Sequence, residues 1–273
     1  MLNSLLPITA IALYLLATLC VGYFLRSGAI ADSEHKSLRL AFVFASIALL
    51  MHLAHAYQVS LVDSRLNFGL SSMAVLVSSI TVLIYLLGSL AMPIRRLGIM
   101  VFPLTILSLA FSHIWHSEEA TAEHISGALG VHVLVSILTY CLLAIAAIQA
   151  LLYVYQERQI KSRSTPAILT ALPPLQTMET LLFRLVAMGF ALLSLALISG
   201  ALFSQELFGH AIEFKHHTIL AVLGWLVFAV LLFKRSTQGL RGSQAAIWTV
   251  GGFLLIQLGY FGTKIVSESL QLQ

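Results

Sequence analysis

The chain has 273 residues, of which 59% are hydrophobic and only 10% are charged, and its formal net charge is +4. An ordinary soluble domain carries about 25% charged residues. The composition therefore excludes a soluble globular protein, a disordered chain and a nucleic-acid-binding protein. In so apolar a chain the small positive excess reflects orientation in a membrane. We predict a protein of the lipid bilayer with no nucleic-acid partner.

Eight apolar runs are long enough to cross a bilayer as helices, which takes roughly 20 residues each. In chain order they cover residues 5–25, 38–57, 70–92, 97–114, 125–153, 182–203, 216–233 and 244–263. We interpret the first run as a retained helix, because no charged residue precedes it and it is longer than the apolar core of a signal peptide. The predicted fold is all-α, a polytopic membrane helix bundle with eight transmembrane helices. Residues 1–273 are predicted to form a single membrane domain.

Lysine and arginine are concentrated in alternate connections between these runs. Twelve lie in the first, third, fifth and seventh connections, and three lie on the other side. Cytoplasmic loops carry the excess of such residues, which predicts an N-out and C-out protein of the bacterial inner (plasma) membrane. Residues 157–179 contain three prolines and are predicted to form a cytoplasmic linker.

Histidines account for nearly all the ionisable residues near the membrane interior. Ionisable side chains are costly in a bilayer and therefore suggest function. Imidazole is neutral near pH 7 and can still bind a metal. On the predicted topology nine of the ten histidines map to the outer half: His52, His55, His113, His116, His124, His132, His210, His216 and His217. Haem iron in a membrane is held by axial histidines, whereas a simple metal site needs three or four ligands.

The position of His132 makes it the strongest single candidate. It lies about 10 Å inside the fifth run, at 1.5 Å per residue. Ser136 and Tyr140 follow on the same helix face and form a polar stripe with it. A buried histidine that bonds a neighbouring backbone carbonyl would show the same pattern.

Two further histidine pairs lie near helix ends. His52 and His55 are three residues apart, so they share one helix face. His216 and His217 open the seventh run and point about 100° apart, so only one of them is expected to face the bundle. Both pairs fit either a ligand role or an interfacial role at a helix end. His113, His116 and His124 surround an acidic loop whose spacing matches no firm metal signature.

Three stretches of the chain are similar to a known family. They read VHVLVSILTYCLLAIAAIQALLYVYQERQIK from Val131, then LPPLQTMETLLFRLVAMGFALLSLALISGALF, then KHHTILAVLGWLVFAVLLFKRSTQGLRGSQAAIWTVGGFLLIQLGYFGTKIV. The first resembles the central helix of the cytochrome c assembly family, the CcsA/ResC/CcmC group of haem-handling membrane proteins. The others continue the resemblance, which spans roughly residues 40–266 and is closest to the HemX/YpjD-like branch.

The resemblance implies a bundle that binds haem b on its outer face. By that resemblance His132, His52 and His216 match family histidines and are the candidate ligands of the haem iron, while His217 stands where a lysine is expected. Two family features are absent. FSQELFGHAIEF replaces the tryptophan-rich motif between Leu202 and Lys215, and the final histidine is missing, because the chain ends SESLQLQ.

We therefore predict a haem-binding inner-membrane protein, involved in cytochrome c assembly or haem handling, that is not an enzyme. The predicted haem-contacting residues are His132, His52, His216, His217 and His55, with Ser136 and Tyr140 as supporting contacts. Other cytochrome c maturation membrane proteins are its expected partners. The alternative is a small-solute or divalent-metal transporter that uses the same outer-facing histidine cluster.

Overall fold

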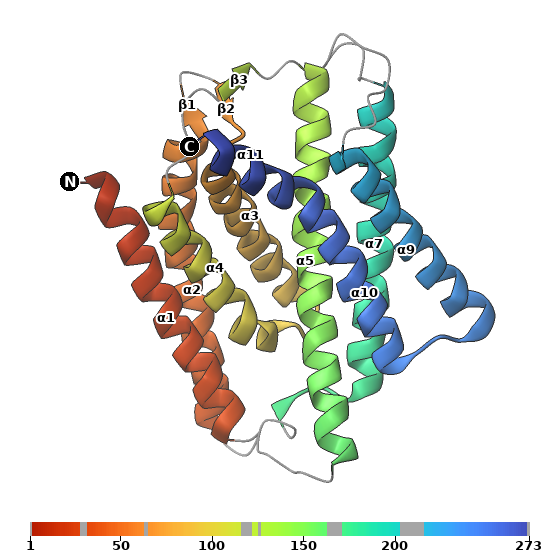
Figure 1. The fold of residues 1–273 in the computed structure, drawn as a ribbon. Helices are drawn as coiled ribbons and strands as arrows, with labels where there is room; N and C mark the ends of the chain where they lie inside the picture. The colour runs from red at the N-terminus through yellow and green to blue at the C-terminus, as the bar shows by residue number, and fades with distance from the viewer. Residues whose placement is uncertain are drawn as a thin grey trace. The chain divides into compact units, whose positions relative to one another are not determined.

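The structure is a computed structural model that describes residues 2–27, 32–62, 65–115, 122–124, 127–162, 171–202 and 216–271. In this part of the chain eight helices are long and apolar enough to cross a membrane. They confirm the predicted all-α polytopic bundle (Figure 1). The long helices are α1 (Leu2–Ser27), α2 (Asp32–Ser60), α3 (Leu70–Ala91), α4 (Gly98–Ile114), α5 (Gly127–Lys161), α7 (Leu175–Leu202), α9 (His216–Gln238) and α10 (Gly242–Gln257).

The remaining elements are short. Helix α10 continues through a π-helical turn, η3 (Leu258–Gly262), into α11 (Thr263–Gln271). A 3-10 turn, η1 (Arg95–Leu97), precedes α4. A small sheet pairs β1 (Leu61–Val62), β2 (Arg65–Asn67) and β3 (Ala122–His124) in that order. Helices dominate because a bilayer offers no water to backbone N–H and C=O groups, so each spanning segment must satisfy its own.

The chain divides into two compact units, which are described separately. Unit 1 comprises residues 1–123 and 155–177, and unit 2 comprises residues 124–154 and 178–273. Helix α5 contributes its first part to unit 2 and its last turns to unit 1. The two ends of the predicted linker 157–179 are helical. Residues 157–161 form the end of α5, and residues 175–179 form the start of α7.

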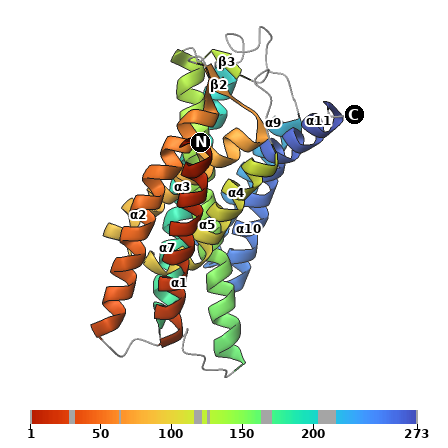
Figure 2. The ribbon, with the colours of Figure 1, turned by 90° about the vertical axis from the view of Figure 1, so that its left-hand side faces the viewer.

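Small side chains allow the helices of unit 1 to pack closely. Helix α1 lies along α2 and α4, and α3 packs against both α2 and α4 (Figure 2). Ala10 and Ala17 of α1 and Ala41, Ala45 and Ala48 of α2 are buried. Membrane helices have no hydrophobic force between them, so small residues that allow backbones to approach are favoured at such contacts. Large apolar side chains on the opposite faces, such as Leu19 and Leu107, are exposed to the surroundings.

Close approach also organises unit 2. A Cβ atom added at Gly189 of α7 would clash with the side chain of Leu143 on α5, which would have to shift. A Cβ atom at Gly252 of α10 would lie 2.9 Å from Cζ of Phe228 on α9. Between α7 and α9, the Trp225 indole stacks on Phe190 with ring centroids 5.4 Å apart. These contacts fix the neighbours of the helices that carry the polar residues described below.

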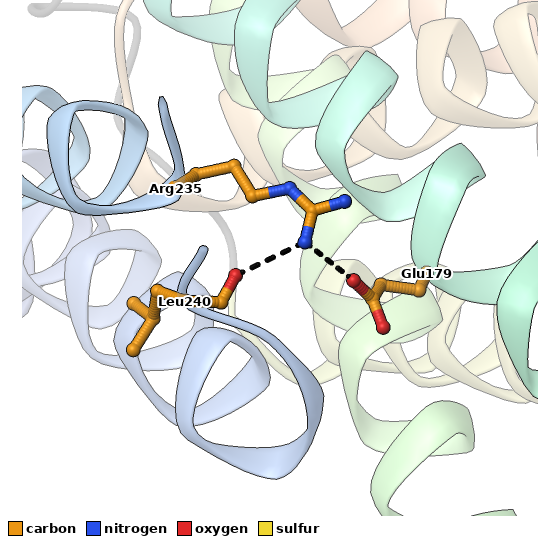
Figure 3. A network of polar contacts seen from close by, with 3 residues as sticks. All are labelled: Glu179, Arg235 and Leu240. Atoms are coloured by element: carbon orange, nitrogen blue, oxygen red, sulfur yellow. Dashed lines mark hydrogen bonds and ion pairs between the residues drawn. The ribbon is translucent and has the colours of Figure 1, made fainter. Parts of the chain in front are cut away.

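An ion pair fastens one end of α9 to α7 (Figure 3). The guanidinium of Arg235 donates to Oε1 of Glu179 at 2.7 Å and to the carbonyl oxygen of Leu240 at 3.2 Å. It also lies 4.4 Å from the ring centroid of Phe183. The turn that presents the Leu240 carbonyl contains Gly239 at a φ of 65°, a left-handed conformation that suits glycine.

Replacing Arg235 with lysine is expected to loosen this end of unit 2. Lysine keeps the charge but lacks the planar group that serves Glu179, Leu240 and Phe183 together. The expected cost is about 1 kcal/mol, the usual net value of one hydrogen bond. Thermal unfolding of the purified protein in detergent would measure it. Arg241→Lys, at an exposed position, is the control, and an equal effect of the two variants would contradict the assigned role.

Candidate functional site

The described histidines near helix ends form two groups, one in each unit. The front histidine group consists of His52 and His55 on α2 and His113 on α4, all in unit 1. The rear histidine group consists of His132 on α5 with His216 and His217 at the start of α9, all in unit 2. His116 and His210 lie outside the described residues, as do the side chains of His35 and His124.

His132 is held by a serine on the neighbouring helix. Its Nδ1 lies 3.0 Å from Oγ of Ser199 on α7. The Ser199 hydroxyl hydrogen is already used, because Oγ donates to the carbonyl of Ala196 at 3.0 Å. With the hydroxyl donating to that carbonyl, Oγ accepts from Nδ1–H of His132, since a hydroxyl has only one hydrogen to give. The lone pair of the imidazole then resides on Nε2. In this tautomer Nε2 can bind a metal while Nδ1–H is held by the serine.

The ring of His132 lies close to the backbone of α7 at Gly200. A Cβ atom added at Gly200 would lie only 3.1 Å from Cε1 of His132. His217 on α9 is close enough to interact electrostatically with His132. The backbone of His217 packs against Gly259 in the π-helical turn, where an added Cβ would lie 3.3 Å from the His217 carbonyl oxygen. His216 is exposed at the first position of α9.

The other two residues of the polar stripe on α5, Ser136 and Tyr140, have different surroundings. The hydroxyl of Tyr140 donates to the carbonyl of Ile256 on α10 at 3.1 Å. Its ring meets Tyr260 and Phe261 of the π-helical turn edge to face, at centroid distances of 6.2 and 6.1 Å. Ser136, one turn from His132, is half-buried. Tyr140 therefore ties α5 to the wide turn, and such turns are frequent at functional sites.

His52 is enclosed by a chain of hydroxyl groups from the other three helices of unit 1. Its Nδ1 lies 3.4 Å from the hydroxyl of Tyr14 on α1, and its Nε2 lies 3.4 Å from Oγ of Ser78 on α3. Ser78 in turn donates to Oγ of Ser108 on α4 at 3.1 Å. The ring is fully buried. These long hydrogen bonds occupy both nitrogens of His52, which favours a role in holding the four helices together.

His55, one turn further along α2, is in the opposite situation. Its side chain is only 7% exposed. In the part of the chain that the structure describes, neither Nδ1 nor Nε2 has a hydrogen-bond partner. His113, near the end of α4, is close enough to interact electrostatically with His55. The two histidines of α2 thus share a helix face but differ completely in their surroundings.

Sequence reasoning missed the hydroxyl groups that position these histidines. Ser199 is 67 residues from His132, and Tyr14 and Ser78 are 38 and 26 residues from His52. Serine is common in membrane helices at packing contacts, so nothing in its local pattern distinguishes Ser199 from its neighbours. Only the tertiary pairing of helices identifies it.

The donor set fits haem iron better than an isolated metal ion. Among the described residues no three His, Cys, Asp or Glu side chains gather as a metal site would need. A structural zinc site takes four protein ligands. Haem iron needs only one or two axial ligands from the protein, and histidine is the usual one. One imidazole with a free Nε2, as at His132, therefore meets the requirement.

Comparison with known proteins agrees with the membrane helix bundle. The family described as Cytochrome C assembly protein matches residues 40–271. The inner membrane protein YpjD of Escherichia coli is 29% identical over 239 residues, which cover 84% of this chain and 87% of YpjD. The cytochrome c biogenesis protein CcsA of Chlamydomonas reinhardtii is 28% identical over 64% of this chain and 50% of its own length.

A third relative, a 28.8 kDa protein of Azospirillum brasilense, is 27% identical over 85% of this chain and 87% of its own length. The eight apolar helices and the likeness to an inner-membrane protein confirm the predicted multi-pass inner-membrane location. The family match spans most of the chain, including the front and rear histidine groups. The chain therefore belongs to the cytochrome c assembly protein family.

Proposed function

We propose that this protein binds haem b at the outer face of the inner membrane and serves cytochrome c assembly or haem handling as a binder or chaperone, not as an enzyme. Family membership supports this proposal. The name of one relative, a cytochrome c biogenesis protein, points the same way. The expected partners are haem itself and other cytochrome c maturation membrane proteins.

The observation that carries the proposal is the orientation of His132 by Ser199. The hydrogen bond from Nδ1 to Oγ of Ser199 fixes both the tautomer and the plane of the ring. Histidines that bind metals almost always donate a hydrogen bond from the N–H of their other ring nitrogen. Nε2 of His132 and the imidazole of His217, which lies near it in unit 2, are the groups that would hold the haem iron.

The rest of the rear site would hold and shield the cofactor. Bound haem would supply a redox-active iron and an extended apolar ring system. The lack of a side chain at Gly200 allows the imidazole of His132 to lie close to α7. Tyr140 keeps the π-helical turn in place through its bond to Ile256. Ser136 lies one turn from His132 on the same face of α5 and remains a predicted contact.

The direct test is a reduced-minus-oxidised absorption spectrum of the full-length protein, purified in detergent with and without added haemin. A sharp b-type band is the expected result. If no band forms even after haemin is added, the protein does not bind haem as proposed, and transport of a metal or small solute becomes the better hypothesis.

Replacing Ser199 with alanine is expected to weaken haem binding roughly 10–100-fold, the usual effect of removing the partner that orients a metal-binding histidine. Haemin titration followed by absorbance would measure the dissociation constant. Ser194→Ala is the matched control, because Ser194 lies on the same helix and serves Trp225 instead. Equal haemin affinities of the two variants would contradict the role assigned to Ser199.

The orientation of the site is part of the same proposal. The lysine and arginine distribution predicts that both termini lie outside. That orientation places the histidine-bearing ends of α2, α5 and α9 at the outer face. Reporter fusions to each terminus, read on both sides of the membrane, would test it. A terminus found in the cytoplasm would move the site to the inner face.

A further inference from the structure

Arg96, in the turn before α4, carries a half-buried charge that its surroundings in unit 1 do not neutralise. Its guanidinium lies over the ring of Phe24 on α1, with Cζ 5.6 Å from the ring centroid. Its Nε is buried, and among the described residues it has no hydrogen-bond partner. An aromatic face attracts a cation but supplies no anion. A buried charge is costly unless it is paired and hydrogen-bonded.

The described side chains of unit 1 offer no carboxylate for this role. The one acidic side chain among them is Glu157, which pairs with Lys161 at 3.2 Å. Unit 2 gives the contrast, because there the guanidinium of Arg235 donates to Glu179 at 2.7 Å. The anion that compensates Arg96 must therefore come from outside the described side chains of this unit.

Arg95 adds a second guanidinium next to the first. Its Nε donates to the carbonyl of Ser89 at 3.3 Å, and its own carbonyl accepts from the hydroxyl of Tyr85 at 2.6 Å. These two bonds hold the turn against the end of α3. Within the described residues no hydrogen bond engages the terminal nitrogens of Arg95, which is exposed. Two adjacent guanidinium groups at the end of a membrane span can thus donate to an anion.

Apolar surface adjoins the two arginines. A small cavity beside Arg95 is lined mostly by apolar side chains from the four helices of unit 1, including Phe42 and Phe102. Near the end of α3, Leu87 and Leu90 are 59% and 64% exposed. A ligand with an anionic head and apolar tails matches this combination, whereas a free anion would use the arginines alone.

We propose that Arg95 and Arg96 bind the phosphate of an anionic phospholipid, whose acyl chains lie against the apolar end of α3. Guanidinium groups match phosphate oxygens through two parallel N–H groups. Basic pockets between transmembrane helices bind anionic lipid headgroups in this way. The site lies at the end of α4 opposite to His113, and it does not depend on the proposed binding of haem.

The test uses the full-length protein, delipidated in detergent, and follows its thermal unfolding. A ligand that binds only the folded protein raises the unfolding midpoint. Phosphatidylglycerol and phosphatidylcholine with identical acyl chains are titrated separately, and inorganic phosphate is the third probe. Arg95→Gln and Arg96→Gln remove one charge each, while Arg96→Lys keeps the charge. Arg26→Gln is the matched control, because Arg26 is an exposed cation in the last turn of α1, at the same end of unit 1.

The parent protein is expected to bind phosphatidylglycerol more tightly than phosphatidylcholine. Each glutamine variant should bind phosphatidylglycerol about fivefold more weakly, which corresponds to about 1 kcal/mol for one cation near a lipid surface. Arg96→Lys should fall between Arg96→Gln and the parent, because lysine lacks the planar group that engages two oxygens. Arg26→Gln should match the parent, and phosphatidylcholine should bind all the variants alike.

Three results would overturn the proposal. The first is equal binding of the two lipids by the parent protein, and the second is an equal loss in Arg26→Gln and Arg96→Gln. The third is a response to inorganic phosphate as strong as the response to phosphatidylglycerol, which would make the ligand a free anion. Arg95→Gln decides the matter if Arg96→Gln does not fold, since Arg95 is exposed. Failure of the haem proposal would appear separately, in the absorption spectrum.

Discussion

Replacing His132 with alanine is expected to abolish the b-type absorption band of the purified protein. Alanine removes the nitrogen that Ser199 holds ready for the iron. The loss should exceed the roughly 10–100-fold effect expected for Ser199→Ala, because the ligand itself is lost rather than its support. The reduced-minus-oxidised spectrum, recorded across a haemin titration, gives the measurement.

Two additions make this experiment decisive. Free imidazole should restore part of the band, since the truncated side chain leaves a space of matching shape beside Gly200. Thr139→Val, two turns along α5 at a buried position, should leave the band unchanged. A full band in His132→Ala would mean that the haem is held elsewhere, with the front histidine group as the next candidate.

Replacing His52 with alanine is expected to destabilise unit 1 and to leave haem binding at the rear site intact. The change creates a cavity at a fully buried position and removes the hydrogen-bond partner of the Tyr14 and Ser78 hydroxyls. Truncation of a large buried side chain costs about 2–5 kcal/mol. We expect the thermal midpoint in detergent to fall accordingly, while the haem band per folded protein stays constant.

Tyr14→Phe is a milder change at the same contact, and its effect on stability can be compared with that of His52→Ala. It removes one hydroxyl and keeps the ring, which stacks on Phe102 at 5.8 Å. Hydrogen bonds between membrane helices contribute about 0.6 kcal/mol on average, so its effect should be several times smaller than that of His52→Ala. Loss of haem from a well-folded His52→Ala protein would instead make His52 a ligand, as the family resemblance implies.

The spanning helices were predictable because the bilayer imposes a simple rule of length and apolarity. Their ends were less so. Helix α5 continues past residue 153 to Lys161, where Glu157 and Lys161 form an ion pair one turn apart at 3.2 Å. Helix α7 begins at Leu175 rather than at 182. In both places polar residues sustain the helix beyond the apolar run, and a search for hydrophobic stretches does not detect this.

The roles of individual histidines were not predictable in the same way. His52 and His55 share one helix face, so the local pattern treats them alike. The difference between them comes from α1 and α3, which bring Tyr14 and Ser78 to His52 and no bonding partner to His55 within the described residues. Likewise the partner of His132 is supplied by α7. Sequence reasoning could therefore nominate the histidines, but tertiary contacts are needed to sort ligand candidates from structural ones.

The division of α5 between the two units has a consequence for biosynthesis. Unit 1 consists of the first four helices together with residues 155–177, and Gln156 donates to the carbonyl of Pro173 at 3.0 Å within that added segment. Domains generally fold as they emerge from the ribosome, the N-terminal one first. Here residues 124–154, which belong to unit 2, are translated before residues 155–177 complete unit 1. Synthesis of the second unit thus begins before the first unit is complete.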